Sequence, residues 1–267
     1  MLDNPRSERI RKVAALSGRS ARKKTGNILV EGPGAVRELV RFRGEHVLDM
    51  YFSEEATERN ASLFRRATES VQWVHVVSPE VSDKISRESQ GVVAVARNEA
   101  ISPVGINSES SGSAFWVLLP KTQDPGNLGT LVRTADAMGA RGVFLGQGTC
   151  EVSNPKVIRA SAGSVFHLPV AHEDFFGTVA NLRRKDTALL GTALHAESVA
   201  LSDLMDDPFG PLHGPHAWVF GNEARGLDEQ EMAVCDRLVH ISMHGQAESL
   251  NVAAAASMCM FASSLAV

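Results

Sequence analysis

The feature that most limits the fold is a set of four apolar runs in the second half of the chain. The runs are AFWVLLP, GVFLG, ALLGTAL and AWVFG, and helical segments separate them. They lack the strict alternation of a strand that faces water on one side. Strands covered on both faces by crossover helices have this pattern. The sequence therefore predicts an α/β domain with a parallel sheet over residues 114–267.

The first half has shorter runs and predicts a smaller α/β domain over residues 1–97. The segment ILVEGPGAVRELVRF fits a strand, a Gly-Pro turn and a helix with Val36, Leu39 and Val40 on one face. Strands of a small mixed sheet are indicated by VLDMYFS, WVHVV and GVVAVA. Residues 98–113 are rich in Ser, Asn, Gly and Pro and lack apolar periodicity, which predicts a linker.

The composition excludes several classes of protein. With 43% hydrophobic and 22% charged residues, the chain has the balance of a globular protein. No apolar run approaches the roughly 20 residues of a membrane helix, and the charged N-terminus is unlike a signal peptide. The three cysteines lie far apart without metal-ligand spacing, and neither GxGxxG nor a phosphate-binding P-loop occurs. We expect a cytoplasmic protein that requires no metal and contacts no membrane.

Basic residues are concentrated at the start of the chain although the net charge is −4. Such a cluster could neutralise the phosphates of a nucleic acid. On charge alone, a solvated helix explains the cluster equally well. The eight residues are Arg6, Arg9, Arg11, Lys12, Arg19, Arg22, Lys23 and Lys24.

Three polar clusters follow predicted elements of the second half, and open parallel sheets bind ligands at the carboxyl ends of their strands. The first, DPGNLGTLVRTADAMGA at residues 124–140, places Asn127 near a helix start and Arg133 further along. Taken alone, these two residues also suit a helix cap and a solvated helix face. The second, GNEARGL at residues 221–227, has Gly221 for close backbone approach and Glu223, which could hold an arginine or merely favour a helix start.

The third cluster is ISMHGQAESLNVAAAASMCMFASSL at residues 241–265. We expect an Ala-rich helix to begin near Ser249, with Glu248, Ser249 and Asn251 at its start. Helix starts suit capping side chains, so an ordinary capped core helix is the simpler alternative.

Together the clusters resemble the three motifs of the SpoU (TrmH-like) branch of the SPOUT methyltransferases. PGNLGTLVRTADAMGA, GNEARGL and ESLNVAAAASM occur in the family's order and spacing, and NPKVIRASAGSVFHLPV at residues 154–170 is similar to the segment after the first motif. The basic stretch, ILVEGPGAVREL and ESQGVVAVA resemble, more loosely, the L30e-like substrate-binding domain of ribosomal-RNA members. This domain supports the nucleic-acid interpretation of the basic cluster.

The resemblance implies a SPOUT-type parallel sheet whose C-terminal segment forms a deep trefoil knot, a rare exception to the rule that chains do not thread loops. It also implies a homodimer with the active site beside the interface, and S-adenosylmethionine as the cofactor. By motif position, the residues that match catalytic positions are Asn127, Arg133, Glu223, Ser249 and Asn251. Those that match the cofactor site are Gly221, Ile241, Ser249 and Leu250, with Thr192 as a weaker candidate.

The implied reaction is methylation of a ribose 2′-hydroxyl in structured RNA, with 23S ribosomal RNA as the expected substrate. We expect Arg133 to stabilise the developing alkoxide or grip the adjacent phosphate, and Glu223 to hold Arg133 or a neighbouring backbone group. Charge suggests RNA contacts at Arg9, Arg19, Arg22, Lys23 and Arg133, and leaves Glu31 and Gln90 open.

Four alternatives remain at this point. The chain could methylate transfer RNA, protect ribosomes from an antibiotic, or bind RNA without catalysis. It could also be a small-molecule α/β enzyme in which the basic cluster is incidental; failure to bind structured RNA in moderate salt would favour that reading.

Overall fold

The computed structural model describes residues 1–101 and 115–266, which form two compact units. The first unit contains the described residues up to 101 together with Glu151–His167, and the second contains the remainder. Residues 151–167 fall within the predicted second domain, whereas in the structure they pack with the first unit. Most of the predicted linker, residues 102–113, lies outside the described residues.

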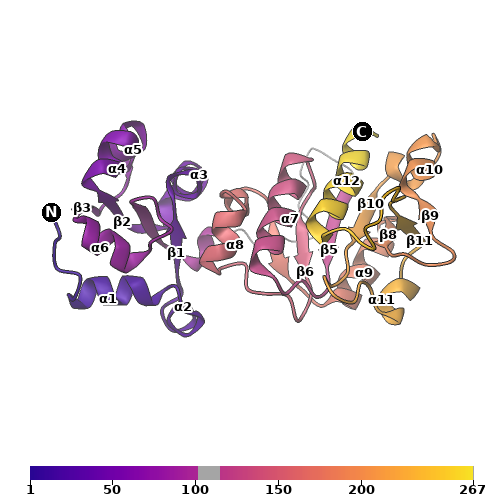
Figure 1. Ribbon diagram of the computed structural model, residues 1–267, viewed down its shortest axis with the longest axis horizontal. Coiled ribbons are helices and arrows are strands. Elements are labelled where there is room, and N and C mark those ends of the chain that lie inside the picture. Colours follow the sequence, from indigo (N-terminus) through magenta and orange to yellow (C-terminus); the bar gives the residue numbers. More distant parts are fainter. Residues whose placement is uncertain (102–114, 267) are drawn as a thin grey trace. The chain divides into compact units, whose positions relative to one another are not determined.

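A four-stranded mixed sheet forms the centre of the first unit (Figure 1), in the order β1-β4-β2-β3. β4 is antiparallel to both β1 and β2, and β2 is parallel to β3. The four strands match the runs predicted from the sequence. Their bounds are β1 Asn27–Glu31, β2 Val47–Ser53, β3 Val74–Val77 and β4 Val92–Arg97.

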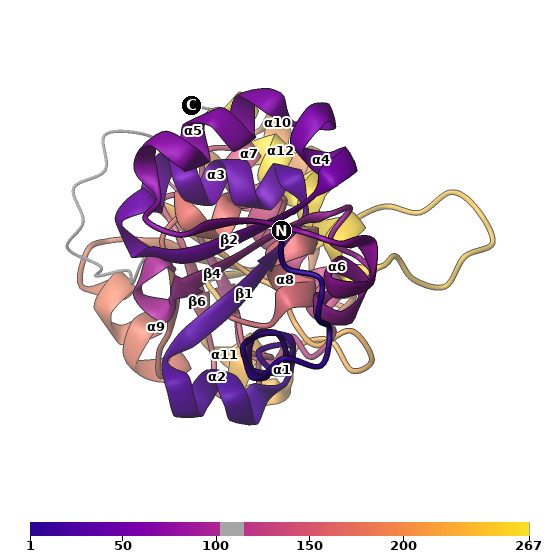
Figure 2. The ribbon, with the colours of Figure 1, turned by 90° about the vertical axis from the view of Figure 1, so that its left-hand side faces the viewer.

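Helices cover both faces of this sheet, as Figure 2 shows for α3, α4 and α5 on one side and α1, α2 and α6 on the other. α1 and α6 pack onto Leu29, Tyr51 and Val93. On the opposite face the rings of Phe52 and Phe64 form a T-shaped pair. The helices of the first unit are α1 Glu8–Ala15, α2 Arg19–Thr25, α3 Pro33–Arg43, η1 Gly44–His46, α4 Glu54–Arg59, α5 Ala61–Ser70, α6 Pro79–Ile85, η2 Asn98–Ala100, α8 Pro155–Ala160 and η3 Ser164–Phe166.

The second unit contains a seven-stranded sheet in the order β7-β6-β5-β10-β8-β11-β9, and every pair in it is parallel. This confirms the predicted α/β fold with a parallel sheet. The apolar runs predicted from the sequence located β5, β6, β8 and β10 but not β7, β9 and β11. The bounds are β5 Phe115–Leu119, β6 Val143–Leu145, β7 Val170–His172, β8 Ala188–Thr192, β9 Val199–Ala200, β10 His216–Val219 and β11 Arg237–His240.

Two layers of helices enclose this sheet (Figure 1). α9 and α11 cover the face that carries Trp116, Leu118 and Val219. α7 and α12 pack against each other on the other face. The helices of the second unit are α7 Pro125–Ala137, α9 Phe175–Arg183, α10 Leu201–Asp206, η4 Pro211–His213, α11 Glu229–Ala233 and α12 Val252–Leu265.

A buried chain of hydrogen bonds joins α12 to β10. The indole N–H of Trp218 donates to Ser263 Oγ at 2.8 Å, and Ser263 Oγ lies 2.7 Å from His216 Nε2. His216 Nδ1 lies 2.8 Å from the Gly214 carbonyl, so Nδ1 carries the proton and Ser263 donates to Nε2. Burial lowers the pKa of His216, which favours this neutral form. Ser263 thus pairs two polar groups that no water reaches.

Replacing Ser263 with alanine is expected to lower the free energy of unfolding by about 2–4 kcal/mol, because the Trp218 N–H and His216 Nε2 would both lose their partner. Urea denaturation of the variant and the wild type measures this loss. Ser264→Ala is the matched control, since the Ser264 hydroxyl donates to the nearby Phe261 carbonyl in an exposed hydrogen bond within its own helix. Equal stability of the two variants would contradict this account of the network.

Candidate functional site

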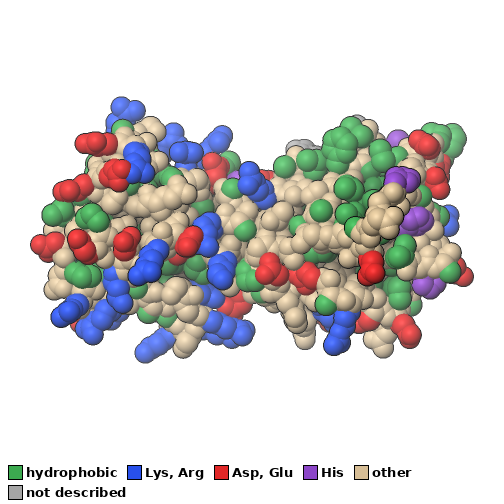
Figure 3. Space-filling view, viewed as in Figure 1, with side chains coloured by type: hydrophobic (Ala, Val, Ile, Leu, Met, Phe, Trp, Pro, Cys, Tyr) green, Lys and Arg blue, Asp and Glu red, His purple; other side chains and the backbone are tan. Residues whose placement is uncertain are grey.

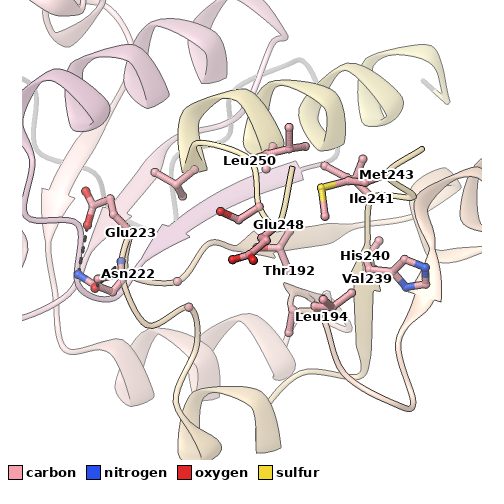
Figure 4. A pocket seen from close by; sticks show the side chains of 17 residues that line it. Thr192, Leu194, Asn222, Glu223, Val239, His240, Ile241, Met243, Glu248 and Leu250 are labelled. Carbon is pink, nitrogen blue, oxygen red and sulfur yellow. Dashed lines mark hydrogen bonds between the residues drawn. The ribbon is translucent and has the colours of Figure 1, made fainter. Parts of the chain in front are cut away.

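A pocket of about 330 Å³ lies where β8, β10 and β11 end. Because these strands are parallel, the loops that follow them meet at one edge of the sheet. Figure 4 shows side chains from the three loops and from the start of α12 around this space. The lining residues are Thr192, Ala193, Leu194, Gly221, Asn222, Glu223, Ala224, Gly226, Val239, His240, Ile241, Met243, Glu248, Ser249, Leu250, Val252 and Ala255.

The structure brings all five candidate cofactor residues to this pocket. They are Thr192, Gly221, Ile241, Ser249 and Leu250. Other lining residues were not predicted from the sequence, among them Leu194, Val239 and Met243. Leu194 and Met243 lie just beyond strand ends, and that position was the one signal that could have identified them. Val239 lies inside β11, a strand that the sequence pattern did not reveal.

The loop after β10 is folded tightly on itself. The amide of Asn222 donates to the Gly226 carbonyl at 2.9 Å, and the Gly226 amide donates back to Asn222 at 2.8 Å. Gly226 has a φ of 67°, a left-handed conformation that glycine adopts without strain. A Cβ atom on Gly221 would lie 2.2 Å from the Gly226 carbonyl carbon and 2.3 Å from the Leu227 amide nitrogen. The loop therefore leaves no room for a side chain at 221.

Glu223 joins this loop to the start of α7. Its carboxylate accepts hydrogen bonds from the backbone amides of Asp124 at 3.2 Å and Gln123 at 3.4 Å. Asn127 Nδ2 donates to the same carboxylate at 3.4 Å. Of the two partners predicted for Glu223, the structure has the neighbouring backbone and not Arg133.

Asn251 extends this network to the third motif. Its Nδ2 donates to Asn127 Oδ1 at 3.1 Å. Its Oδ1 caps α12 by accepting from the amides of Ala253 at 2.8 Å and Ala254 at 3.4 Å. The helix begins at Val252, three residues later than the sequence analysis expected. One residue from each motif thus belongs to a single chain of hydrogen bonds.

Arg133 does not join this network. It is exposed on α7 and makes no hydrogen bond or ion pair within the described part of the chain. It lies six positions after Asn127, which is roughly one and two-thirds turns of an α-helix. Its side chain therefore leaves the helix on a different side from Asn127 and is available to a ligand.

The candidate RNA contacts of the first unit differ in their surroundings. Arg9 lies 3.3 Å from the carboxylate of Asp49, and Arg19 lies 2.6 Å from that of Glu151. Lys23 is exposed. In Figure 3 Lys and Arg side chains gather along the part of this unit that carries α1 and α2.

Arg22 is buried, with 7% of its surface exposed. It donates to the carbonyls of Leu16 and Ser17 and, at 2.9 Å, to the Glu151 carboxylate. Burial raises the pKa of Glu151, but hydrogen bonds and charges from Arg19 and Arg22 outweigh it and hold this pKa below its ordinary value. These contacts favour a structural role for Arg22 over the RNA contact that charge alone suggested.

Glu31 and Gln90, which the sequence left open, also have defined places. Glu31 is buried and accepts a hydrogen bond of 2.6 Å from Arg159, so it is committed to an ion pair. Gln90 is exposed, with a φ of 51°, and lines a second pocket in the first unit.

Among residues 1–101 and 115–266, no group of three or more His, Cys, Asp or Glu side chains is placed to hold a metal ion. In the same part of the chain, none of the helices is long and apolar enough to cross a membrane.

Solved structures similar to this chain include RNA-modifying enzymes. The AviRb SpoU methyltransferase of Streptomyces viridochromogenes, solved with its cofactor AdoMet, is 28% identical, with a TM-score of 0.77 over 97% of this chain and 98% of that one. An AdoMet-bound rRNA methyltransferase from Sinorhizobium meliloti is 25% identical, with a TM-score of 0.80 over 98% and 96%.

Sequence comparisons agree with the structural ones. The chain is 28% identical to the 23S rRNA (guanosine(2553)-2′-O)-methyltransferase RlmP of Bacillus subtilis, over 97% of each protein. It is 31% identical to the 23S rRNA (guanosine-2′-O-)-methyltransferase RlmB of Bordetella pertussis, over 88% of this chain and 96% of that one. Residues 7–94 match the MRM3-like substrate binding domain, and residues 114–261 match the SpoU rRNA Methylase family. The chain belongs to the SpoU rRNA methylase family, as its three motifs predicted.

Proposed function

We propose that the protein uses S-adenosylmethionine to methylate a ribose 2′-hydroxyl in 23S ribosomal RNA. The observation that carries this proposal is the hydrogen-bonded chain Glu223–Asn127–Asn251, which links the three motifs beside a pocket at the sheet edge. Relatives named as 23S rRNA 2′-O-methyltransferases support the reaction and the substrate.

The residues of the pocket fit the cofactor. Leu194, Ile241 and Leu250 offer apolar surface to an adenine ring, and the backbone at Gly221 can approach a ligand closely. Thr192 and Ser249 add hydroxyl groups. When bound, the cofactor supplies a methyl group that its sulfonium has already activated. No metal is needed for such a transfer, so we assign none.

The remaining task of the protein is to position the ribose and help its hydroxyl lose a proton. Alignment of the reacting atoms can supply much of the reduction of the barrier. Asn127, Ser249 and Asn251 are proposed to orient ribose and cofactor. Glu223 is proposed to hold the loop after β10 against the start of α7, where Asn127 lies. Arg133, which is always charged, is proposed to stabilise the developing alkoxide or to bind the adjacent phosphate.

The first unit is proposed to bind the RNA as an L30e-like domain. Its mixed sheet with helices on both faces, and its match to a substrate binding domain, support this role. Arg9, Arg19 and Lys23 are the proposed phosphate contacts, which makes binding dependent on salt. A cytoplasmic location belongs to the same proposal, because ribosomal RNA is the substrate.

An apolar face on α12 supports a homodimer. Met258, Phe261 and Leu265 are 45%, 51% and 60% exposed and follow one another at helical spacing. Contiguous exposed apolar surface on a helix of this kind marks an interaction site. The mass of the protein in solution tests this assignment. The C-terminal trefoil knot is proposed from the family resemblance. The strand order is compatible with it, because β10 lies between β5 and β8, two strands that precede it in the chain.

The reaction is tested by methyl transfer from labelled S-adenosylmethionine to total RNA from a strain that lacks the protein. We expect label at one ribose 2′-oxygen of 23S ribosomal RNA, located by mapping of the nucleotide. Free RNA and ribosomal subunits serve as parallel substrates. Label in transfer RNA alone would replace the proposed substrate, and failure of the protein to bind the cofactor would contradict the reaction itself.

A further inference from the structure

One carboxylate that lines the pocket has no hydrogen-bond or ion-pair partner among the residues that the structure describes. Glu248, on the segment between β11 and α12, lines the pocket and makes no hydrogen bond or ion pair within residues 1–101 and 115–266. Glu223, the other acidic lining residue, is occupied by two backbone amides and Asn127. In Figure 4 the Glu248 carboxylate is turned toward the middle of the pocket, whereas Glu223 lies at its margin beside Asn222.

The charged side chains that line the pocket are acidic. Neither lysine nor arginine occurs among the lining residues, and the remaining titratable side chain is His240, whose Nδ1 lies 2.9 Å from Ser198 Oγ. The carboxylate of Glu248 is therefore not neutralised by a neighbour. A pocket with this charge attracts a cation in preference to a neutral molecule of the same shape.

We infer that Glu248 makes the pocket select S-adenosylmethionine over the product that it becomes, S-adenosylhomocysteine. This inference rests on the proposed function. As the ribose oxygen bonds to the methyl carbon, the bond from sulfur to that carbon breaks and sulfur keeps the electron pair. The hydroxyl proton leaves to solvent, and the sulfonium becomes a neutral thioether. The two molecules thus differ chiefly by one methyl group and one positive charge.

Glu248 is a specificity-determining residue in this scheme. An attraction between unit charges several ångströms apart in a solvent-exposed pocket changes a dissociation constant by about three- to tenfold. The attraction acts on the cofactor before transfer and is absent afterwards. The product is therefore held less tightly than the cofactor, which favours its release.

Isothermal titration calorimetry of the full chain with each of the two compounds tests the inference. In Glu248→Gln we expect the Kd for S-adenosylmethionine to rise about three- to tenfold, while the Kd for S-adenosylhomocysteine changes by less than about twofold. Glu229→Gln is the matched control, because Glu229 is an exposed carboxylate on α11 that does not line the pocket. Both values should stay at the wild-type level in that variant.

The remaining outcomes separate this inference from the proposed function. An equal loss of affinity for both compounds would mean that Glu248 binds a group that they share, such as the ammonium, and would overturn the inference. Unchanged affinities in Glu248→Gln would overturn it as well. In both cases the wild type still binds the cofactor and the proposed function stands. A wild type that binds neither compound would overturn the proposed function.

Discussion

Replacing Arg133 with alanine is expected to lower kcat for methyl transfer about 100- to 1,000-fold, the usual cost of removing a group that stabilises developing negative charge. The Kd for S-adenosylmethionine should stay within about twofold, because Arg133 does not line the pocket and makes no contact with the network of Glu223. Single-turnover kinetics and calorimetry measure the two quantities separately.

Two further variants serve as controls for this experiment. Arg237→Ala removes an exposed arginine of the same unit that lies outside the three motifs and the pocket, and it should leave kcat unchanged. Arg133→Lys keeps the charge but loses the planar guanidinium group. We therefore expect it to retain part of the activity that Arg133→Ala loses. Near-normal turnover in Arg133→Ala would remove Arg133 from the mechanism.

The fold could be predicted where strands are buried and apolar along their whole length. β5 and β10 are buried along their whole length, and their sequences contain almost nothing but hydrophobic residues. The three strands that the sequence analysis missed are β7, β9 and β11. They have two to four residues, and β11 carries Arg237 and His240. Length alone does not explain the difference, because β6 and β10 have three and four residues and are fully buried. β7, β9 and β11 are only partly buried, so they gain their order from the neighbouring strand, which a local pattern cannot reveal.

The site could be predicted in part, and the reason differs from residue to residue. Gly221 and Ile241 follow strands of one parallel sheet, so their meeting at one edge follows from topology. The pairing of Asn127 with Glu223 and Asn251 joins residues about a hundred positions apart. Their presence in one site could be predicted only from the resemblance to the three family motifs. The separation of Arg133 from this network follows from the helical repeat.

The predictions for the first unit depended on charge, and charge does not reveal burial. Arg22 lies in a run of basic residues, yet its guanidinium is paired with Glu151, far along the chain. Glu31 is paired with Arg159 in the same manner. Both partners lie in the segment Glu151–His167, which packs with the first unit. No local sequence pattern indicates these ion pairs, because each partner lies more than a hundred residues away.

Replacing Gly221 with alanine is expected to raise the Kd for S-adenosylmethionine about 10- to 100-fold. The added Cβ would overlap the backbone of Gly226 and Leu227, which cannot move aside as a flexible side chain would. The loop must therefore shift, and overpacking of this kind costs about 1–3 kcal/mol. The shift displaces the loop that lines one wall of the pocket, so cofactor binding, measured by calorimetry, should weaken and methyl transfer should fall with it.

Gly214→Ala provides the matched control at the other end of β10. A Cβ atom on Gly214 would meet nothing within 4 Å, and its φ of −121° suits any residue. This variant should bind the cofactor as the wild type does and unfold at the same urea concentration. If Gly221→Ala also binds the cofactor normally, the loop after β10 does not form a wall of the cofactor site. The assignment of Gly221 to that site from its position in the second motif would then be wrong. If it binds weakly but remains folded by circular dichroism, the close contact between Gly221 and Gly226 is what shapes that wall.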